Sequence, residues 1–157
     1  MKCIGILWNS LGKFNKQAVE DISNNICVDK VMSINLGENL SNFIWDIYET
    51  DLPIVQERIK IKIQNTADYF ESKEITIMFI DIDENIVPDV VAFLKQLKKT
   101  IREKYSKVVG HYQFDNVFHL TENDDEYMRI VNALRRYGVI ESEQENFVKK
   151  MKKIYIA

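Results

Sequence analysis

The segment Glu74–Asp83 constrains the fold more than any other part of the sequence. It reads EITIMFIDID, in which β-branched and other apolar residues follow one another almost without interruption. Such a run is typical of a strand that is buried on both faces and lies in the middle of a sheet. A sheet of that kind buries its surfaces under helices. We therefore expect one sheet, with Glu74–Asp83 at its centre and helices covering it.

Hydrophobic periodicity divides the rest of the chain between strands and helices. Short apolar runs or alternating patterns predict further strands at Lys2–Trp8, Val28–Leu36 and Asn116–Leu120. Apolar residues at helical spacing predict five helices, with stripes over residues 14 to 26, 40 to 47, 55 to 70, 90 to 105 and 127 to 134. The predicted order is β-α-β-α-α-β-α-β-α. We expect a single domain over 1–157, with 139–157 as a C-terminal helical or extended tail.

Local signals mark the ends of several predicted helices. Pro53 and Pro88 stand at helix starts, where a missing backbone N–H does no harm. Thr121-Glu122-Asn123-Asp124 is typical of an N-cap with an acid three residues on, and Gly138 is typical of a C-cap. These signals agree with the element order that the periodicity predicts.

Composition restricts the classes of partner. The chain has 157 residues, of which 46% are hydrophobic and 29% charged, as in soluble globular proteins. Its 21 Lys and Arg against 24 Asp and Glu give a net charge of −3, which argues against nucleic acid or an anionic membrane as the main partner. No apolar run approaches the roughly 18 residues of a membrane span, and the N-terminus has no signal-peptide pattern. We expect a cytoplasmic protein.

Two patterns that would bind metal or phosphate are absent from the sequence. The two cysteines and two histidines lack the paired spacing of a zinc site, so no metal ligands are predicted. Gly5 and Gly12-Lys13 straddle the end of the first strand, but six residues separate the glycines where a P-loop has four. Phe14 also follows the lysine, where a P-loop has a hydroxyl residue for magnesium. Lys13 stays a candidate only as a cation beside an anion site.

Asp81 and Asp83 form a candidate site at the end of the central strand. An apolar strand leading into Asp-x-Asp resembles the nucleophile loop of haloacid-dehalogenase-type phosphatases. Two such carboxylates hold magnesium, and one attacks phosphorus. The alternative is a strand that ends in solvated acids before a turn. Both interpretations stay open at this point.

His119 is the third candidate, at the end of the predicted strand Asn116–Leu120 and just before a helix. The sheet would hold such a histidine in place while its ring projects into a cleft. There it can act as a nucleophile that accepts a phosphoryl group and passes it on. The alternative is a histidine that packs in the core or at the strand end.

The surroundings of His119 resemble the nucleoside diphosphate kinase family. Thr100-Ile101-Arg102 and then Asn116-Val117-Phe118-His119-Leu120-Thr121-Glu122 are similar to that family's Thr-Ile-Arg and Asn-[Ile/Val]-[Ile/Val]-His-Gly-Ser-Asp segments. Tyr48 with Asp51-Leu52 resembles its His-Tyr-x-Asp-Leu segment. Chain length and element order also fit. The resemblance implies a ferredoxin-like α/β (α+β) sandwich, in which helices pack on one antiparallel four-stranded sheet.

The resemblance also implies roles for the matching residues. His119 would carry the phosphoryl group, Arg102 would contact nucleotide phosphates and Asn116 a sugar hydroxyl. Tyr48 would line the phosphate pocket. Magnesium would accompany the nucleotide and spread the developing charge. The partner would be a nucleotide or another small phosphate compound, and because the family forms homo-oligomers, self-association is expected too.

The sequence departs from the family at several of its functional positions. Trp8-Asn9-Ser10 stands where the family has Lys-Pro-Asp, so its phosphate-contacting lysine is absent unless Lys13 takes that role. Leu120 replaces the glycine after the histidine, and the acid that orients the histidine ring falls near Arg129, with Glu126 one turn earlier. A nucleotide-sensing or protein-interaction domain without catalysis is therefore kept as an alternative to a phosphotransferase.

Overall fold

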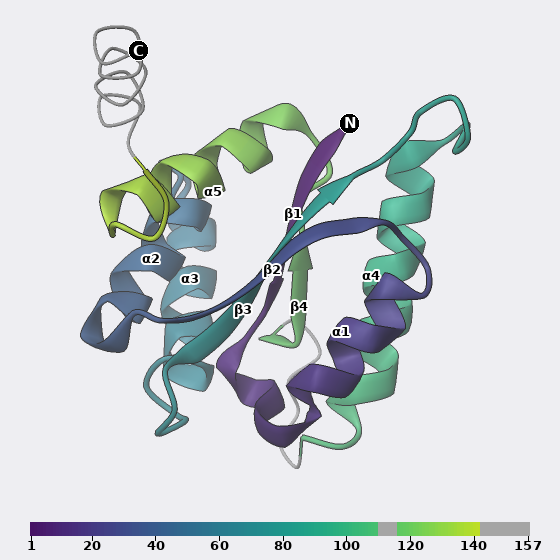
Figure 1. The fold of residues 1–157 in the computed structure, drawn as a ribbon. Coiled ribbons are helices and arrows are strands. Elements are labelled where there is room, and N and C mark those ends of the chain that lie inside the picture. The colour runs from purple at the N-terminus through teal and green to yellow at the C-terminus, as the bar shows by residue number, and fades with distance from the viewer. Residues whose placement is uncertain (110–115, 142–157) are drawn as a thin grey trace, which may run out of the picture.

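The computed structural model describes residues 1–109 and 116–141, so most of the tail predicted at 139–157 lies outside the described residues. The described elements confirm the predicted order. In chain order they are β1 (Lys2–Leu7), α1 (Asn15–Ser23), β2 (Val28–Asn35), α2 (Leu40–Tyr48), α3 (Pro53–Asn65), β3 (Glu74–Asp81), α4 (Val90–Ser106), β4 (Phe118–Leu120) and α5 (Asp124–Arg136) (Figure 1).

The four strands form one antiparallel sheet in the order β2-β3-β1-β4. The strand predicted as central is central, because β3 pairs with β2 on one side and with β1 on the other. Ile80, for example, lies opposite Cys3 on β1 and Val28 on β2. With the helices packed on this sheet, the fold is ferredoxin-like α+β, as expected.

The helices cover the two faces of the sheet unequally. Leu7, Met78 and Ile80 belong to a core shared with α1 and α4, whereas Ile6 and Ile77 belong to a second core beneath α2, α3 and α5. Figure 1 shows α1 and α4 together on one side of the sheet and the other three helices on the opposite side. Neighbouring strand residues thus alternate between two apolar layers, which is the burial that a nearly continuous apolar strand predicts.

The short strand β4 is held at the edge of the sheet by close packing on a glycine. Gly5 on β1 lies opposite Leu120, and a Cβ at Gly5 would come within 2.9 Å of the Phe118 ring. Phe118 and Leu120 are fully buried in the core beneath α1 and α4. Because side chains alternate along a strand, the residue between them, His119, points to the other face.

Several helix ends differ from the sequence prediction. Helix α4 begins at Val90 after the N-cap Asp89, so Pro88 lies before the helix and does not open it. The helix expected to continue to residue 70 ends at Asn65, and at Thr66 the backbone leaves helical geometry while its carbonyl accepts a hydrogen bond from Asn9 Nδ2 at 2.9 Å. The N-cap of α5 is Asn123, whose Oδ1 accepts from the Glu126 N–H, and not Thr121. Thr121 is fully buried and its Oγ1 accepts from the Ile4 N–H at 2.9 Å, so its hydroxyl joins β1 to the chain after β4.

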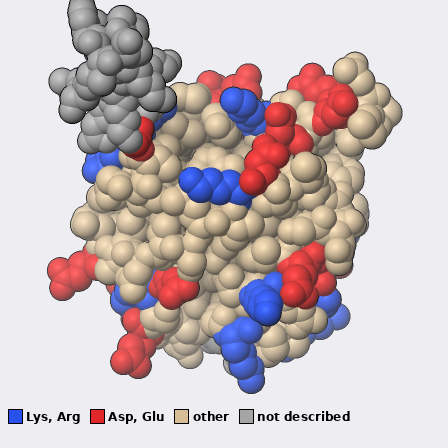
Figure 2. All heavy atoms as spheres, viewed as in Figure 1, with Lys and Arg blue, Asp and Glu red and all other residues tan. Residues whose placement is uncertain are grey.

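Charged side chains of both signs are spread over the surface. On the face drawn in Figure 2, blue and red side chains intermix around a largely uncharged centre and form no continuous basic patch. Among the helices of residues 1–109 and 116–141, none has the length and apolarity that a membrane crossing requires.

Candidate functional site

His119 opens onto a cavity of about 760 Å³ on the α3 side of the sheet edge. Four of the five residues that the sequence analysis assigns to this site line the cavity together. They are Tyr48 from α2, Arg102 from α4, Asn116 before β4, and His119 itself. Helix α3 supplies the rest of the wall, which combines apolar side chains with the cations Arg58 and Lys62. Residues far apart in sequence are therefore brought to one concave surface, as the resemblance predicts.

Tyr48 fixes the imidazole of His119. The phenol oxygen lies 2.9 Å from His119 Nδ1, and the two rings meet edge to face with centroids 5.2 Å apart. A phenol is a better donor than acceptor, so we assign the bond as Tyr48 O–H donating to Nδ1. The neutral tautomer that accepts this bond carries its proton on Nε2.

The imidazole is neutral at physiological pH. Burial, and after it the positive charges of Lys62, Lys98 and Arg102, lower the pKa of His119 from its ordinary 6.5 to about 3. Both causes disfavour the imidazolium. His119 therefore has an unprotonated ring nitrogen, which a nucleophile needs, at any pH above the acid range.

Arg102 reaches the free edge of the sheet. Its Nε donates a hydrogen bond to the Phe118 carbonyl at 2.9 Å, which ties α4 to β4 beside His119. Asn116 is 7% exposed, and its own carbonyl accepts from Ser10 Oγ at 2.8 Å. Both residues are thus held by hydrogen bonds to backbone carbonyls of the segment just before the histidine.

Lys62 is one of the α3 residues in the cavity wall that sequence reasoning missed. Its ammonium donates to Asn116 Oδ1 at 3.1 Å and lies 4.8 Å from the centre of the Trp8 ring and 5.4 Å from that of Tyr48. In the sequence it is one of several charged residues in a helix, a pattern that is typical of a solvated face. The only signal that could have found it is its spacing of four residues from Arg58, which places both cations on one side of α3.

Lys13 lies elsewhere and does not line the His119 cavity. It borders a separate cavity of about 570 Å³ between α1 and the β2–β3 edge, together with Lys16. Its ammonium lies 5.3 Å from the centre of the Phe14 ring. The 3₁₀ helix Asn9–Phe14, with Gly12 at φ 49°, turns the chain onto the other face of the sheet. The position beside His119 at which we expected Lys13 is occupied by Lys62.

Glu126, one turn before the position at which the resembled family has its ring-orienting acid, serves in the helix cap. Glu126 Oε2 accepts a hydrogen bond from the Glu122 backbone N–H at 2.7 Å. Arg129 donates to the Ile47 carbonyl at 3.5 Å. The orienting contact to His119 comes from Tyr48 instead.

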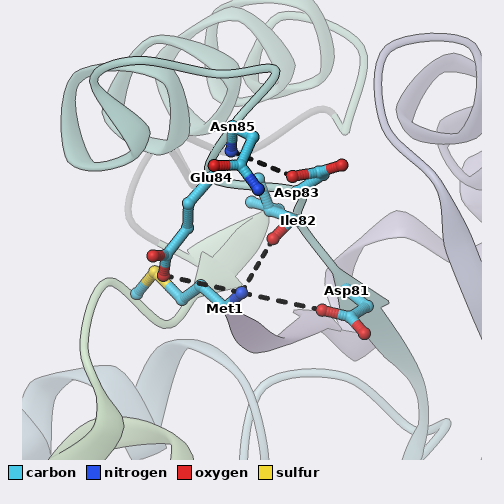
Figure 3. A network of polar contacts seen from close by, with 6 residues as sticks. All are labelled: Met1, Asp81, Ile82, Asp83, Glu84 and Asn85. Carbon is cyan, nitrogen blue, oxygen red and sulfur yellow. Dashed lines mark hydrogen bonds and ion pairs between the residues drawn. The ribbon is translucent and has the colours of Figure 1, made fainter.

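Asp81 and Asp83 do not form the magnesium site of a phosphatase. Figure 3 shows the two carboxylates engaged with different partners. Asp81 lies 3.6 Å from the Met1 amine, and Asp83 accepts from the Asn85 N–H at 2.9 Å within the turn after β3. Across residues 1–109 and 116–141, no three side chains of the ligand-forming types gather where a metal ion could be held. This geometry agrees with the alternative, a strand that ends in solvated acids.

Comparison with known proteins supports the fold. No family model and no curated protein matches the sequence. Among solved structures, the orthorhombic crystal form of Aquifex aeolicus nucleoside diphosphate kinase superposes with a TM-score of 0.51. The match covers 92% of this chain and 96% of that chain, at 11% sequence identity. The chain shares the fold of that kinase, and its function must be argued from its own side chains.

Proposed function

We propose that this chain binds a nucleoside triphosphate or diphosphate in the His119 cavity and transfers a phosphoryl group through His119. One observation carries the proposal. A neutral imidazole, held by Tyr48 on a rigid strand, opens onto a cavity that is also lined by Arg58, Lys62 and Arg102. Cations beside an uncharged nucleophile are what attack on a polyanionic phosphate requires.

The proposed step is a displacement at the terminal phosphorus. The Nδ1 lone pair of His119 forms the new P–N bond, the bond from phosphorus to the bridging oxygen breaks, and its electron pair leaves with the nucleoside diphosphate. Neutral imidazole gives up no proton in order to attack. A second nucleoside diphosphate reverses the step with its own terminal oxygen and restores the imidazole.

The neighbouring residues have distinct roles in this scheme. The Tyr48 hydrogen bond to Nδ1, at 2.9 Å in the structure, opens before attack, and the phenol then donates to a phosphoryl oxygen. Arg102 pairs with the phosphates, and Asn116 contacts the sugar. The apolar side chains of Val55, Ile59 and Ile61 offer a wall for the base.

Magnesium would enter with the nucleotide. The described residues that line the cavity include no aspartate or glutamate, so none of them offers magnesium a carboxylate ligand. The donor set of these described residues does not fit a resident magnesium ion, and the residue roles above do not depend on one.

The test is phosphorylation by γ-labelled ATP in the presence of magnesium. We expect acid-labile, alkali-stable label on the wild-type chain that passes to added GDP. His119→Gln removes the label, and His111→Gln, which changes the only other histidine, keeps it. An unlabelled wild-type chain, in an assay where an authentic nucleoside diphosphate kinase is labelled, contradicts the transfer.

A second function, nucleotide binding without transfer, is favoured by the same Tyr48 contact. The phenol occupies the nitrogen that would attack, and Leu120, fully buried, stands where the resembled family has glycine. Calorimetry separates the two functions. Binding of ATP without label on His119 supports a nucleotide-sensing domain, and the absence of both contradicts the two proposals together.

A further inference from the structure

The cavity that Lys13 lines carries charges of both signs and is separate from the His119 cavity. Lys13, in the 3₁₀ helix, and Lys16, in the first turn of α1, border it on the helical side. Glu74, at the start of β3, borders it on the sheet side. Within the part of the chain that the structure describes, neither ammonium forms an ion pair with a carboxylate. Charges of opposite sign that line one cavity without meeting leave room for a ligand between them.

Two buried residues in the wall of this cavity have side-chain atoms without a hydrogen-bond partner. They are Trp8, which is fully buried, and Asn9, which is 4% exposed. Among the described residues, Trp8 Nε1 and Asn9 Oδ1 are the only buried side-chain nitrogen or oxygen atoms that lack a partner. The Asn9 amide is fixed, because its Nδ2 donates to the carbonyls of Thr66 at 2.9 Å and of Ser72 at 2.8 Å. Unpaired buried polar atoms are rare in folded proteins, so two of them in one cavity wall point to a ligand.

Hydrogen bonds fix the walls of the cavity relative to one another. Thr76 Oγ1 donates to Asn15 Oδ1 at 2.8 Å, which joins β3 to the start of α1. Ser33 Oγ on β2 donates to Glu74 Oε1, which holds the carboxylate against the sheet. A site whose walls are already in place loses less conformational entropy when a ligand binds.

We propose that this cavity binds a free aliphatic α-amino acid. The carboxylate of the ligand lies at Lys13 and Lys16, with the Trp8 N–H as a further donor. The ammonium of the ligand lies at Glu74, with Asn9 Oδ1 as a further acceptor. The inference concerns a second site and does not rest on the phosphoryl transfer proposed above.

The residues of the wall favour an amino acid over a simple anion. Phosphate or a fatty carboxylate would meet the two lysines, but Glu74 would repel it. A zwitterion places an opposite charge against each side of the cavity. Val19 on α1 and Val31 on β2 line the same cavity and offer contacts to an aliphatic side chain.

The indole N–H of Trp8 reports on a ligand in this cavity. The chain has two tryptophans, and Trp45, on α2, is not among the residues that line the cavity, so it serves as the internal reference. NMR of the ¹⁵N-labelled chain shows both indole signals, and Trp45→Phe assigns them. Trp8 also lies 4.8 Å from the Lys62 ammonium in the His119 cavity, so the backbone amide of Lys13 is followed as well to locate the ligand.

The test is NMR titration of the full chain with L-leucine, isocaproate and isoamylamine. Isocaproate is leucine without the amine, isoamylamine is leucine without the carboxylate, and both keep its aliphatic side chain. We expect leucine to cause saturable shifts of the Trp8 indole and the Lys13 amide. The other two compounds should bind at least about tenfold more weakly, as the loss of one hydrogen bond to a charged group requires.

Substitutions on the two sides of the cavity assign the ends of the ligand. Glu74→Gln should weaken leucine binding about tenfold without weakening isocaproate binding, and the double variant Lys13→Met with Lys16→Met should weaken both. Lys99→Met changes an exposed lysine of α4 outside the cavity and should bind leucine as the wild type does. Circular dichroism checks each fold, and Glu74→Ala, with the same expected loss, replaces Glu74→Gln if that variant is misfolded.

Each other outcome overturns the proposal. Equal affinities for leucine and isocaproate mean that the cavity does not bind the ammonium. Wild-type affinity for leucine in the folded double lysine variant removes the lysines from the carboxylate contacts. Leucine shifts confined to the surroundings of His119 assign the ligand to the other cavity, and the lack of any saturable shift means that the chain does not bind leucine. None of these results affects the proposed transfer through His119.

Discussion

The cavity around His119 and the turn after β3 both place polar side chains at the end of a strand, and they differ in where the partners of those side chains come from. His119 meets Tyr48 from α2 and lines its cavity with residues of α3 and α4. Asp83 and Asn85 bond to each other within one turn. Partners from several elements hold a side chain in one orientation, whereas a contact within one turn leaves the Asp83 carboxylate exposed to water.

This difference shows that the reactivity of a polar side chain depends on its burial and on the charges that the fold places around it. The acids after β3 are exposed, so water screens their charges. Burial, together with the positive charges around the ring, lowers the pKa of His119 to about 3. Perturbed titration in a cavity is typical of functional sites. Four predictions, from the largest expected effect to the smallest, test this contrast.

The largest effect is expected on stability, from the packing that holds β4 in place. Phe118 is fully buried against Gly5, so Phe118→Ala should lower the free energy of unfolding by about 3 to 5 kcal/mol. Ile86, beside the turn after β3, is 76% exposed, and Ile86→Ala should change it by less than about 0.5 kcal/mol. Urea unfolding measures both. Similar losses in the two variants would mean that β4 is no better anchored than the turn.

Arg102 should matter more for nucleotide binding than other cations on its helix. Arg102→Leu removes a guanidinium from the cavity and should weaken ATP binding at least about tenfold. Lys99→Leu, on the same helix, removes a side chain that is 62% exposed and should leave the affinity unchanged. Calorimetry measures both affinities. Equal effects would reduce the role of Arg102 to long-range attraction.

The low pKa of His119 predicts how stability depends on pH. In the unfolded chain this imidazole titrates near 6.5 and in the folded chain near 3, so between these values the unfolded state binds more protons. Stability from the neutral ring is therefore fully present above pH 6.5 and is lost as the pH falls towards 3. Urea unfolding at pH 7, 5.5 and 4.5 should show a steeper loss for the wild type than for His119→Gln. Parallel losses would mean that the ring titrates normally in the folded chain.

The smallest effects are expected at the acids after β3. Asp81→Asn and Asp83→Asn change exposed side chains, so each should alter the free energy of unfolding by less than about 0.5 kcal/mol. Neither should change the affinity for ATP or the labelling of His119. A loss of labelling in either variant would revive the magnesium site that the geometry does not support.

Much of the fold can be predicted from the sequence because the residues on a buried face are apolar and recur with the period of the helix or strand. The apolar run at Glu74–Asp83 predicts a central strand, which the structure has at Glu74–Asp81, and the stripes along α4 and α5 predict their buried faces. Helix ends are less predictable where a side chain serves a distant segment. Thr121 resembles an N-cap, but its hydroxyl bonds to the backbone of β1, and Asn123 caps the helix.

Residues of the candidate site could be predicted only where they occur in a short sequence segment that resembles a known family. Tyr48, Arg102, Asn116 and His119 occur in segments that resemble a family, and the structure gathers them around one cavity. Lys62 and Lys13 carry no such pattern. Which cavity a lysine lines depends on the side of the sheet on which its segment lies. The turn at Gly12 sends Lys13 to one face, whereas α3 brings Lys62 to the other, beside His119.

The central claim is that the His119 cavity, and not the turn after β3, is where this chain meets a nucleotide. The most direct measurement follows backbone amide signals of the ¹⁵N-labelled chain during titration with magnesium and ATP. The account predicts that the largest shifts fall on Tyr48, Lys62, Arg102 and His119, while Asp83 to Asn85 stay unchanged. Shifts centred on the turn, or none at saturating ATP, would contradict it.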